Sequence, residues 1–383
     1  MSSSELTPPD HSSLQPVGRT GSLLLEMRNI RIEGFSDERW HKIIKGVNVI
    51  LNRGEILGLI GESGAGKSTL GLAAMGFARP GCRITSGEII FDGLDLGKAT
   101  LSVKKHIWGT RIAYVAQSAA AAFNPAHRLM DQTVESTVRE KIKGEAEARL
   151  DAVNLYRSLQ LPQADTIGER YPHQVSGGQL QRVMTAMAIS PRPDLIIFDE
   201  PTTALDVTTQ VEVLASMREI VERFDTAAIY ITHDLAVVAQ MADRIKVLRY
   251  GEEVEEAETE EMLNAPKQSY TKSLWSVRAL QKPVQKGDDI LLDIKSVNAA
   301  YGKSRVLHDV SITVPRGSTV AVVGESGSGK STTARVVTGL LPPEEGKIIF
   351  DGVGLPTKLS DRSKDQLQKI QMILVGGDLG IER

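Results

Sequence analysis

The sequence predicts an α/β fold in which a mixed sheet carries a helical insertion, followed by a partial second copy of the same domain. Three observations lead to this prediction. The apolar run Ile56–Ile60 passes through a glycine-rich loop into a helix that begins near Leu70. The apolar run Leu195–Phe198 ends in two carboxylates, as expected of a parallel strand buried on both faces. Finally, Gly87–Gly93 recurs as Gly346–Gly352, which indicates an internal repeat.

The glycine-rich loop has the composition of a phosphate-binding loop. Its glycines let successive backbone N–H groups face one anion, and the N-terminus of the next helix adds partial positive charge. Lys67 would reach the β- and γ-phosphates of a nucleotide, and the Ser68 hydroxyl would hold Mg²⁺. The candidate nucleotide-binding residues are Gly61, Glu62, Ser63, Gly64, Ala65, Gly66, Lys67, Ser68 and Thr69.

The same loop pattern recurs later in the chain, after the strand-like run Val320–Val323. Two copies in a strand–loop–helix context argue against the alternative of a glycine-rich turn that binds nothing. Ser331 is the second candidate ligand for Mg²⁺. The candidate nucleotide-binding residues of this copy are Gly324, Gly329, Lys330, Ser331 and Thr332.

Composition limits the class of protein. The 383 residues suggest two domains or slightly more, and a hydrophobic content of 41% is enough for sizeable cores. A net charge of −3 gives no global basic field for nucleic acid. The single cysteine, Cys82, excludes a disulfide framework and a multi-cysteine zinc site. No apolar run approaches the roughly 18 residues that span a bilayer, so we expect a cytosolic chain whose membrane role comes through a partner.

The first half of the chain alternates between strand and helix patterns. Residues 1–20 are rich in Ser, Pro and Gly, and we expect a disordered leader. Phe35 or Trp40 could stack on a purine, and a simply packed aromatic is the alternative for either. Residues 128–165 predict a helical insertion with a break at Leu161-Pro162. We expect short strands at 23–27, 43–51, 55–60 and 88–91, a turn at Asp92-Gly93, and helical spacing of Val134, Val138, Lys141 and Ile142.

Polar groups follow the apolar strands of the second half. Carboxyl ends of parallel strands face the ligand crevice. Asp199 can therefore hold Mg²⁺ through water, and Glu200 can polarise an attacking water as a general base. His233 follows the strand at 227–232 and is a candidate for the same edge. Ahead of them, a helix opens at Ser176, Gly177, Gly178 and Gln179, which forms a second candidate anion-binding end.

The remaining segments have plainer interpretations. A helix is expected around residues 211–221. The acidic run at 252–261 is expected to be a solvated face. Residues 276–288 are polar, contain a proline and a glycine, and are expected to form a linker.

Together these residues resemble an ATP-binding-cassette (ABC) transporter ATPase, a P-loop NTPase, over residues 23–275. In that resemblance Gln117 is the glutamine that touches Mg²⁺ and the membrane partner, and Ser176–Gln179 is the signature motif. Asp199 is the Mg²⁺-coordinating aspartate, Glu200 the catalytic glutamate and His233 the switch histidine. Asp206 lies in the loop that crosses the dimer interface.

Three short motifs resemble the importer branch for oligopeptides, dipeptides and nickel: residues 123–125, 171–174 and 268–271. The chain departs from the pattern at Ser118-Ala119, where Asp-Pro is usual, and at Val175, where leucine is common. The resemblance implies ATP and Mg²⁺ as cofactors and a peripheral place on the cytoplasmic face of the inner membrane. It implies permease subunits, a second cassette from another copy or another subunit, and indirectly a solute-binding protein as partners, and no nucleic acid.

The repeat is incomplete beyond its phosphate loop. Gly317 corresponds to Gly54, and Tyr301 stands where the family places its adenine-stacking aromatic. Matching Arg111 to Lys369 places Val375 where Gln117 stands, and the following residues no longer resemble the family. We therefore expect a frameshifted or truncated second copy without signature, acidic strand or switch histidine. The predicted division is 1–20 leader, 21–275 complete domain, 276–288 linker and 289–383 partial domain.

Three functions remain open at this stage. The leading hypothesis is the ATPase subunit of a peptide-type importer, in which the complete cassette pairs with another cassette. The second is a soluble, non-transport ABC ATPase, which usually carries long coiled coils, zinc-binding cysteines or a long charged linker. The third is a remnant that binds nucleotide or a membrane partner without hydrolysis. Because the cassette does not touch the cargo, peptide, nickel and opine-like solutes all remain possible.

Overall fold

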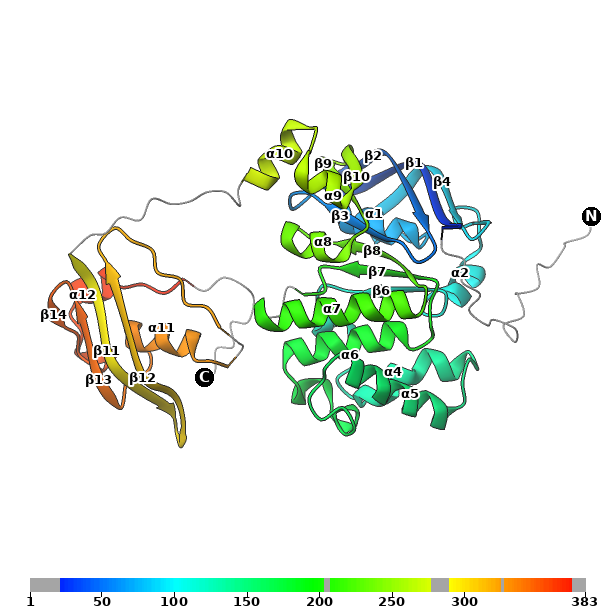
Figure 1. The fold of residues 1–383 in the computed structure, drawn as a ribbon. Helices are drawn as coiled ribbons and strands as arrows, with labels where there is room; N and C mark the ends of the chain where they lie inside the picture. Colours follow the sequence, from blue (N-terminus) through cyan, green and yellow to red (C-terminus); the bar gives the residue numbers. More distant parts are fainter. Residues whose placement is uncertain (1–20, 203–206, 277–288, 325–326, 374–383) are drawn as a thin grey trace, which may run out of the picture. The chain divides into compact units, whose positions relative to one another are not determined.

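The computed structural model describes residues 21–202, 207–276, 289–324 and 327–373, and its ribbon is shown in Figure 1. The predicted leader and nearly all of the predicted linker lie outside the described residues. The chain divides into two compact units. The first carries the elements from β1 to α10 and the second those from β11 to α12. The exact four-part division into domains stays a prediction.

An antiparallel sheet forms one layer of the first unit. Its order is β2-β1-β4-β5, with β1 at Leu23–Ser36, β2 at Arg39–Asn52, β4 at Cys82–Phe91 and β5 at Leu94–Asp95. Three predicted strands are present here but extend further, because pairing between neighbours carries them through polar residues that the apolar pattern does not mark. The predicted turn is confirmed by the positive φ of Asp92 and Gly93, at 48° and 80°.

The second sheet of this unit holds the predicted apolar strands. Its order is β10-β9-β3-β8-β7-β6, parallel except for β10. Every residue of β3, β7 and β8 is buried. The carboxyl ends of these strands therefore meet at one edge of the sheet. The strands are β3 Ile56–Ile60, β6 Ile112–Val115, β7 Leu195–Asp199, β8 Ala227–Ile231, β9 Arg244–Arg249 and β10 Glu252–Glu258.

Helices cover the parallel sheet, and a helical insertion follows β6 (Figure 1). The insertion contains α3 Ala119–Ala122, α4 Leu129–Arg139, α5 Glu145–Ser158 and α6 Gly177–Ile189. The other helices are α1 Lys67–Ala74, α2 Leu101–Ile107, α7 Val207–Arg223, α8 Leu235–Met241, α9 Thr259–Asn264 and α10 Ser269–Ser276. The predicted insertion is confirmed. Helix α4 ends at Arg139, before the expected helical positions Lys141 and Ile142, because Lys141 turns the chain at φ 57°, and Ile142 is 40% exposed.

The acidic run is more than the solvated face that the sequence predicts. Lys246 of β9 is buried, and its ammonium pairs with the carboxylates of Glu253, at 2.7 Å, and Glu256. The buried Glu255 carboxylate accepts hydrogen bonds from the backbone N–H groups of Lys267 and Gln268, at 2.6 and 3.0 Å. A buried charge needs such partners, so these acids fix the end of the sheet and the start of α10.

The described part of the second unit repeats the antiparallel layer and the helix that follows the phosphate loop, but not the parallel sheet. Its sheet order is β12-β11-β13-β14, with α11 and α12 beside it. The Arg53–Asp92 ion pair of the first unit, at 2.7 Å, recurs here as Arg316–Asp351. The elements are β11 Ile290–Tyr301, β12 Ser304–Pro315, α11 Lys330–Thr338, β13 Glu345–Phe350, β14 Val353–Gly354 and α12 Lys364–Lys369.

The predicted strand Val320–Val323 is wrong: these residues have no regular structure, and Val323 is 82% exposed. The reason is a lack of neighbours. The corresponding strand of the first unit, β3, is hydrogen-bonded between β8 and β9. Within the described part of the second unit, no strand follows β14 that could take their place.

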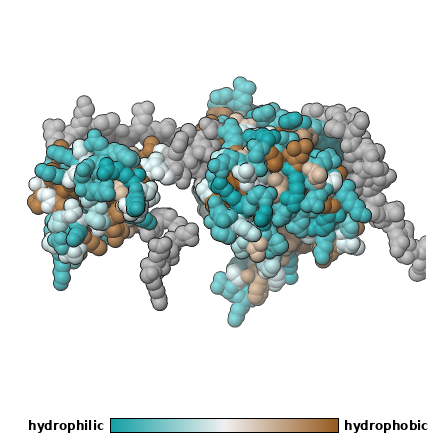
Figure 2. Space-filling view, turned by 90° about the horizontal axis from the view of Figure 1, so that it is seen from below, coloured by the Kyte–Doolittle hydropathy of each residue, from teal (hydrophilic) through white to brown (hydrophobic). Residues whose placement is uncertain are grey.

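Large hydrophobic side chains on the surface are mostly scattered. Figure 2 shows one face of the first unit that is largely hydrophilic, with isolated hydrophobic residues. Single exposed apolar residues are ordinary for a folded domain. Among the described helices, none has the length and apolar character to cross a membrane.

Hydrogen exchange tests the difference between the two apolar segments. We expect the backbone amides of Ile56–Ile60 to exchange roughly 10³-fold or more slowly than those of Val320–Val323, because opening the central strand requires most of the unit to unfold. Mass spectrometry of peptides from the intact chain would measure both rates. Equal protection of the two segments would contradict the absence of a strand at 320–323.

Candidate nucleotide-binding site

The glycine-rich loop bends back onto the N-terminus of α1. Gly64 and Gly66 have φ of 82° and 95°, in the left-handed region, and Gly66 is the N-cap of the helix. A Cβ atom at Gly66 would lie 2.6 Å from Cδ1 of Ile44. Only glycine therefore fits at this point, and the first N–H groups of α1 are left pointing into the loop.

Lys67 is held beneath this loop. It is 7% exposed, and its ammonium donates hydrogen bonds to the carbonyl oxygens of Gly61, at 2.8 Å, and Glu62, at 3.0 Å. Burial lowers the pKa of Lys67 below its ordinary value, and the carboxylates of Glu200 and Asp199 oppose that shift. The ammonium of Lys67 is thus held in place by backbone carbonyls of the same loop whose bound phosphates it would contact.

Asp199 lies at the carboxyl end of β7 and is 3% exposed. The Ser68 hydroxyl donates to its Oδ1 at 2.7 Å, and the Tyr114 hydroxyl donates to its Oδ2 at 2.5 Å. The Arg79 guanidinium approaches Oδ2 at 3.9 Å. The structure therefore brings together Ser68 and Asp199, the two groups predicted to hold Mg²⁺.

Glu200, the next residue, contacts the other two predicted catalytic groups. Gln117 donates to its Oε2 at 3.1 Å, and Nδ1 of His233 lies 2.9 Å from its Oε1. The backbone of Glu200 has φ 49°, which is unfavourable for a residue with a side chain. Its N–H donates to the carbonyl of Ile231 at 2.9 Å, which holds this conformation at the strand edge.

The chemistry of these groups suits Mg²⁺ better than a metal that needs a protein cage. Mg²⁺ prefers oxygen ligands and usually takes only one or two carboxylates together with phosphates and water. Ser68 and Asp199 offer such oxygens side by side. In the described part of the chain, no cluster of three or more His, Cys, Asp or Glu could hold a metal by itself.

The predicted signature lies apart from this cluster. Ser176 is the N-cap of α6, where its hydroxyl accepts from the N–H of Gln179 at 3.3 Å and its own N–H donates to the Gln179 side chain at 3.0 Å. Gly177 and Gly178 form the first turn of the helix. Among the described hydrogen bonds and ion pairs, none joins these residues to the phosphate loop. Asp206 lies outside the described residues.

The described residues of the second phosphate loop have the same local geometry as their counterparts in the first. Gly327 and Gly329 have φ of 85° and 94°, and Gly329 is the N-cap of α11. Lys330 donates to the carbonyl of Gly324 at 2.8 Å, as Lys67 does to Gly61. Ser331 and Thr332 follow in the first turn of α11, and Thr332 is buried.

The candidate adenine-stacking aromatics lie on exposed hairpins. Phe35 and Trp40 face each other at the end of β1 and β2, with ring centroids 5.4 Å apart and exposed fractions of 53% and 40%. The Arg83 guanidinium carbon lies 3.9 Å from the Trp40 ring centroid. In the second unit Tyr301 is 43% exposed, and its hydroxyl accepts from Arg335 at 2.9 Å. The choice between Phe35 and Trp40 stays open.

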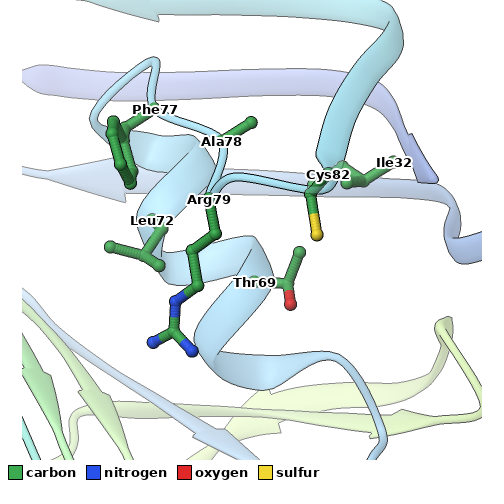
Figure 3. Close-up of a pocket in the computed structure, with 7 residues that line it drawn as sticks. All are labelled: Ile32, Thr69, Leu72, Phe77, Ala78, Arg79 and Cys82. Atoms are coloured by element: carbon green, nitrogen blue, oxygen red, sulfur yellow. The ribbon is translucent and has the colours of Figure 1, made fainter. Parts of the chain in front are cut away.

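Sequence reasoning missed three residues that contact the site: Tyr114, Arg79 and Tyr270. Arg79 and Cys82 line a pocket beside α1 with Ile32, Thr69, Leu72, Phe77 and Ala78 (Figure 3). Tyr270 of α10 accepts a hydrogen bond from the N–H of Glu62 at 3.3 Å. Tyr270 falls in the motif at 268–271, which the sequence marks only as typical of the importer branch. Tyr114 begins the run that ends at the predicted Gln117 but has no role assigned from sequence, and nothing in the local sequence marks Arg79.

This fold and this edge of the sheet define a nucleotide-binding domain of the phosphate-loop class. A family model described as ABC transporter matches residues 44–203 and again residues 307–375, more than half of the chain. The chain therefore belongs to the ABC transporter family, and the second match is a partial second copy of the family's domain.

Curated relatives agree with this assignment, and solved structures share the fold. The chain is similar to the glutathione import ATP-binding proteins GsiA of Shigella dysenteriae serotype 1 and Escherichia coli O157:H7, each 32% identical over 91% of this chain. It spans 63% of the length of these relatives. Its fold is similar to the ATP-binding cassette MJ0796 bound to ADP and Pi (TM-score 0.55, 23% identity, 62% of this chain and 99% of that one). It is also similar to cbiO1 from Clostridium perfringens (TM-score 0.54, 22% identity, 64% and 92%).

Gly66→Ala tests the shape of the loop. We expect it to weaken ATP binding by at least about 10-fold, because a left-handed backbone costs about 1–2 kcal/mol for alanine and the new methyl group meets Ile44. Gly93→Ala is the matched control, since Gly93 has φ 80° with open space around it. Calorimetric titration with ATP would measure both. Equal affinities in the two variants would contradict a steric requirement at Gly66.

Tyr270→Phe tests the contact between α10 and the loop. Loss of one neutral hydrogen bond of about 0.5–1.5 kcal/mol should weaken ATP binding roughly 2- to 10-fold. The substitution keeps the ring, so the contact with the Arg249 guanidinium carbon, 4.4 Å from the Tyr270 ring centroid, would remain. Tyr250→Phe, at a side chain that is 65% exposed, is the control. Unchanged affinity in Tyr270→Phe would show that the loop holds its shape without α10.

Proposed function

We propose that this chain is the ATP-binding and ATP-hydrolysing subunit of an ABC importer for peptides or similar small solutes. The observation that carries the proposal is the cluster at the edge of the parallel sheet. There Ser68 meets Asp199, and Glu200 meets both Gln117 and His233. The importer assignment is supported by the names of the GsiA relatives.

In this proposal the first phosphate loop binds ATP. The ammonium of Lys67 and the N–H groups at the start of α1 hold the phosphate oxygens. Ser68, Asp199 and Gln117 hold Mg²⁺, which when bound neutralises developing charge on the transferred phosphoryl group. Asp199 is suited to this role because its Oδ1 already faces the Ser68 hydroxyl.

Glu200 is proposed to orient and deprotonate the attacking water. General-base catalysis contributes about 10²–10⁴-fold to such reactions. His233 and Gln117 each contact one oxygen of the Glu200 carboxylate, so both can fix its orientation when nucleotide arrives. The hydrogen bond from the Glu200 N–H to the Ile231 carbonyl, at 2.9 Å, holds the residue at the strand edge despite its unfavourable φ.

A second cassette is required in this proposal. The signature residues Ser176, Gly177, Gly178 and Gln179 begin a helix of the insertion, and they would face the nucleotide of a neighbouring cassette. That neighbour is another copy of this chain or a separate subunit. Permease subunits, and through them a solute-binding protein, are the further partners. The place of action is the cytoplasmic face of the inner membrane.

The second loop has a narrower proposed role. Gly324, Gly329, Lys330, Ser331 and Thr332 can bind the phosphates of ATP, with Ser331 as the Mg²⁺ ligand. Hydrolysis is assigned to the first loop, because Glu200 and His233 belong to that unit. Nucleotide at the second loop would therefore contribute to binding or pairing rather than to turnover.

Glu200→Gln tests the assigned chemistry. We expect ATP affinity to stay within about 3-fold of wild type while phosphate release falls by about 10²-fold or more, because the amide cannot accept the proton of water. Glu222→Gln is the control, since Glu222 pairs with Arg218 on the exposed face of α7. Phosphate release and ATP binding would be measured across a range of protein concentrations. Hydrolysis that persists in Glu200→Gln would contradict the role of Glu200.

The concentration series also tests the partner. If another copy of this chain supplies the signature, turnover per chain should rise with protein concentration. Binding without turnover at every concentration would contradict hydrolysis by pairs of this chain.

A further inference from the structure

The two oxygens of the Asp199 carboxylate have different partners. Oδ1 accepts from the Ser68 hydroxyl, whereas Oδ2 accepts from the Tyr114 hydroxyl at 2.5 Å. The Arg79 guanidinium adds positive charge on the Oδ2 side, 3.9 Å away. Because Ser68 and Asp199 are the proposed Mg²⁺ groups, the oxygen that faces the metal site is Oδ1, and Oδ2 is held by the protein.

The position of Tyr114 beside Oδ2 of Asp199 is fixed by the parallel sheet. It lies on β6, hydrogen-bonded in parallel to β7, with Tyr114 opposite Ile197. Its hydroxyl is a donor and the ionised carboxylate can only accept, so the contact is a hydrogen bond from Tyr114 to Asp199. Arg79 reaches the same carboxylate from the loop after α1, its side chain running alongside the helix near Leu72 (Figure 3).

The second copy has different residues at the positions matched to Tyr114 and Arg79. Matching Arg111 to Lys369 places Met372 at the position of Tyr114. Matching Gly76 to Gly339, each just after its helix, places Pro342 at the position of Arg79. Neither residue can donate a side-chain hydrogen bond to a carboxylate. The turn at Gly327 and Gly329 and the start of α11 therefore form without counterparts of Tyr114 and Arg79.

We propose that Tyr114 is a positioning residue that holds Oδ2 of Asp199 and so presents Oδ1, beside Ser68, to Mg²⁺. This inference rests on the proposed binding of Mg²⁺ and ATP at the first loop. Groups that orient a metal ligand typically change metal affinity by about 10- to 100-fold when they are removed. Without the Tyr114 hydroxyl, the Asp199 carboxylate can rotate away from Ser68. The free energy needed to reorient this carboxylate would then weaken Mg²⁺ binding.

The test is Tyr114→Phe in the full chain, which keeps the ring and removes the hydroxyl. A fluorescent, non-hydrolysable ATP analogue is held at fixed concentration while Mg²⁺ is raised from an EDTA-buffered solution. We expect the Mg²⁺ concentration at half-maximal binding to rise about 10-fold, with affinity in EDTA unchanged. The matched control is Tyr156→Phe, which removes a hydroxyl bonded to Thr133 at 2.6 Å in the helical insertion. We expect it to lower the melting temperature but to leave the Mg²⁺ midpoint in place.

Each result decides the proposal. An unchanged Mg²⁺ midpoint in Tyr114→Phe overturns it while leaving the proposed function intact. An equal loss of affinity with and without Mg²⁺ also overturns it, because that result marks a general disturbance of the loop. Failure of the wild-type chain to bind the analogue at any Mg²⁺ concentration overturns the proposed function together with this inference.

Discussion

The parallel pairing of β3, β6, β7 and β8 is the constraint on which the site depends. Parallel strands end on the same side, so the residues that follow them are brought together whatever their separation in the sequence. The phosphate loop follows β3, Asp199 ends β7, and His233 comes shortly after β8. Three of these strands are completely buried, which makes that edge of the sheet rigid. Ser68, Tyr114 and Arg79 can therefore converge on the carboxylate of Asp199.

Much of this arrangement could be predicted because its signals are local. The phosphate loop, the apolar strand before Asp199 and the helical insertion can each be recognised from a local sequence pattern. The contacts of Tyr114 and Tyr270 could not be predicted, because no local pattern indicates that either hydroxyl bonds to a group 85 or 208 residues away. A tyrosine at either position could equally be a packed aromatic, so only the fold distinguishes a packing role from a contact with the site.

One wrong prediction and one incomplete prediction have the same origin. Val320–Val323 has the composition of a strand, but a strand needs neighbours to bond its backbone groups. The acidic run after β9 has the composition of a solvated face, but it surrounds the buried Lys246. In both cases the sequence pattern describes the segment correctly, and the environment supplied by distant residues decides the outcome.

The strand order of the parallel sheet also has a consequence for synthesis. The phosphate loop is translated early, at residues 61–69, yet both strands that flank β3 come from residues 227–249. A nascent chain therefore carries the loop exposed while more than half of the first unit is still to be made. Such long-range pairing is slow and leaves apolar strands open to aggregation. A ribosome that paused before β8 would hold a chain that contains the whole proposed nucleotide-binding loop but neither of the strands that flank β3.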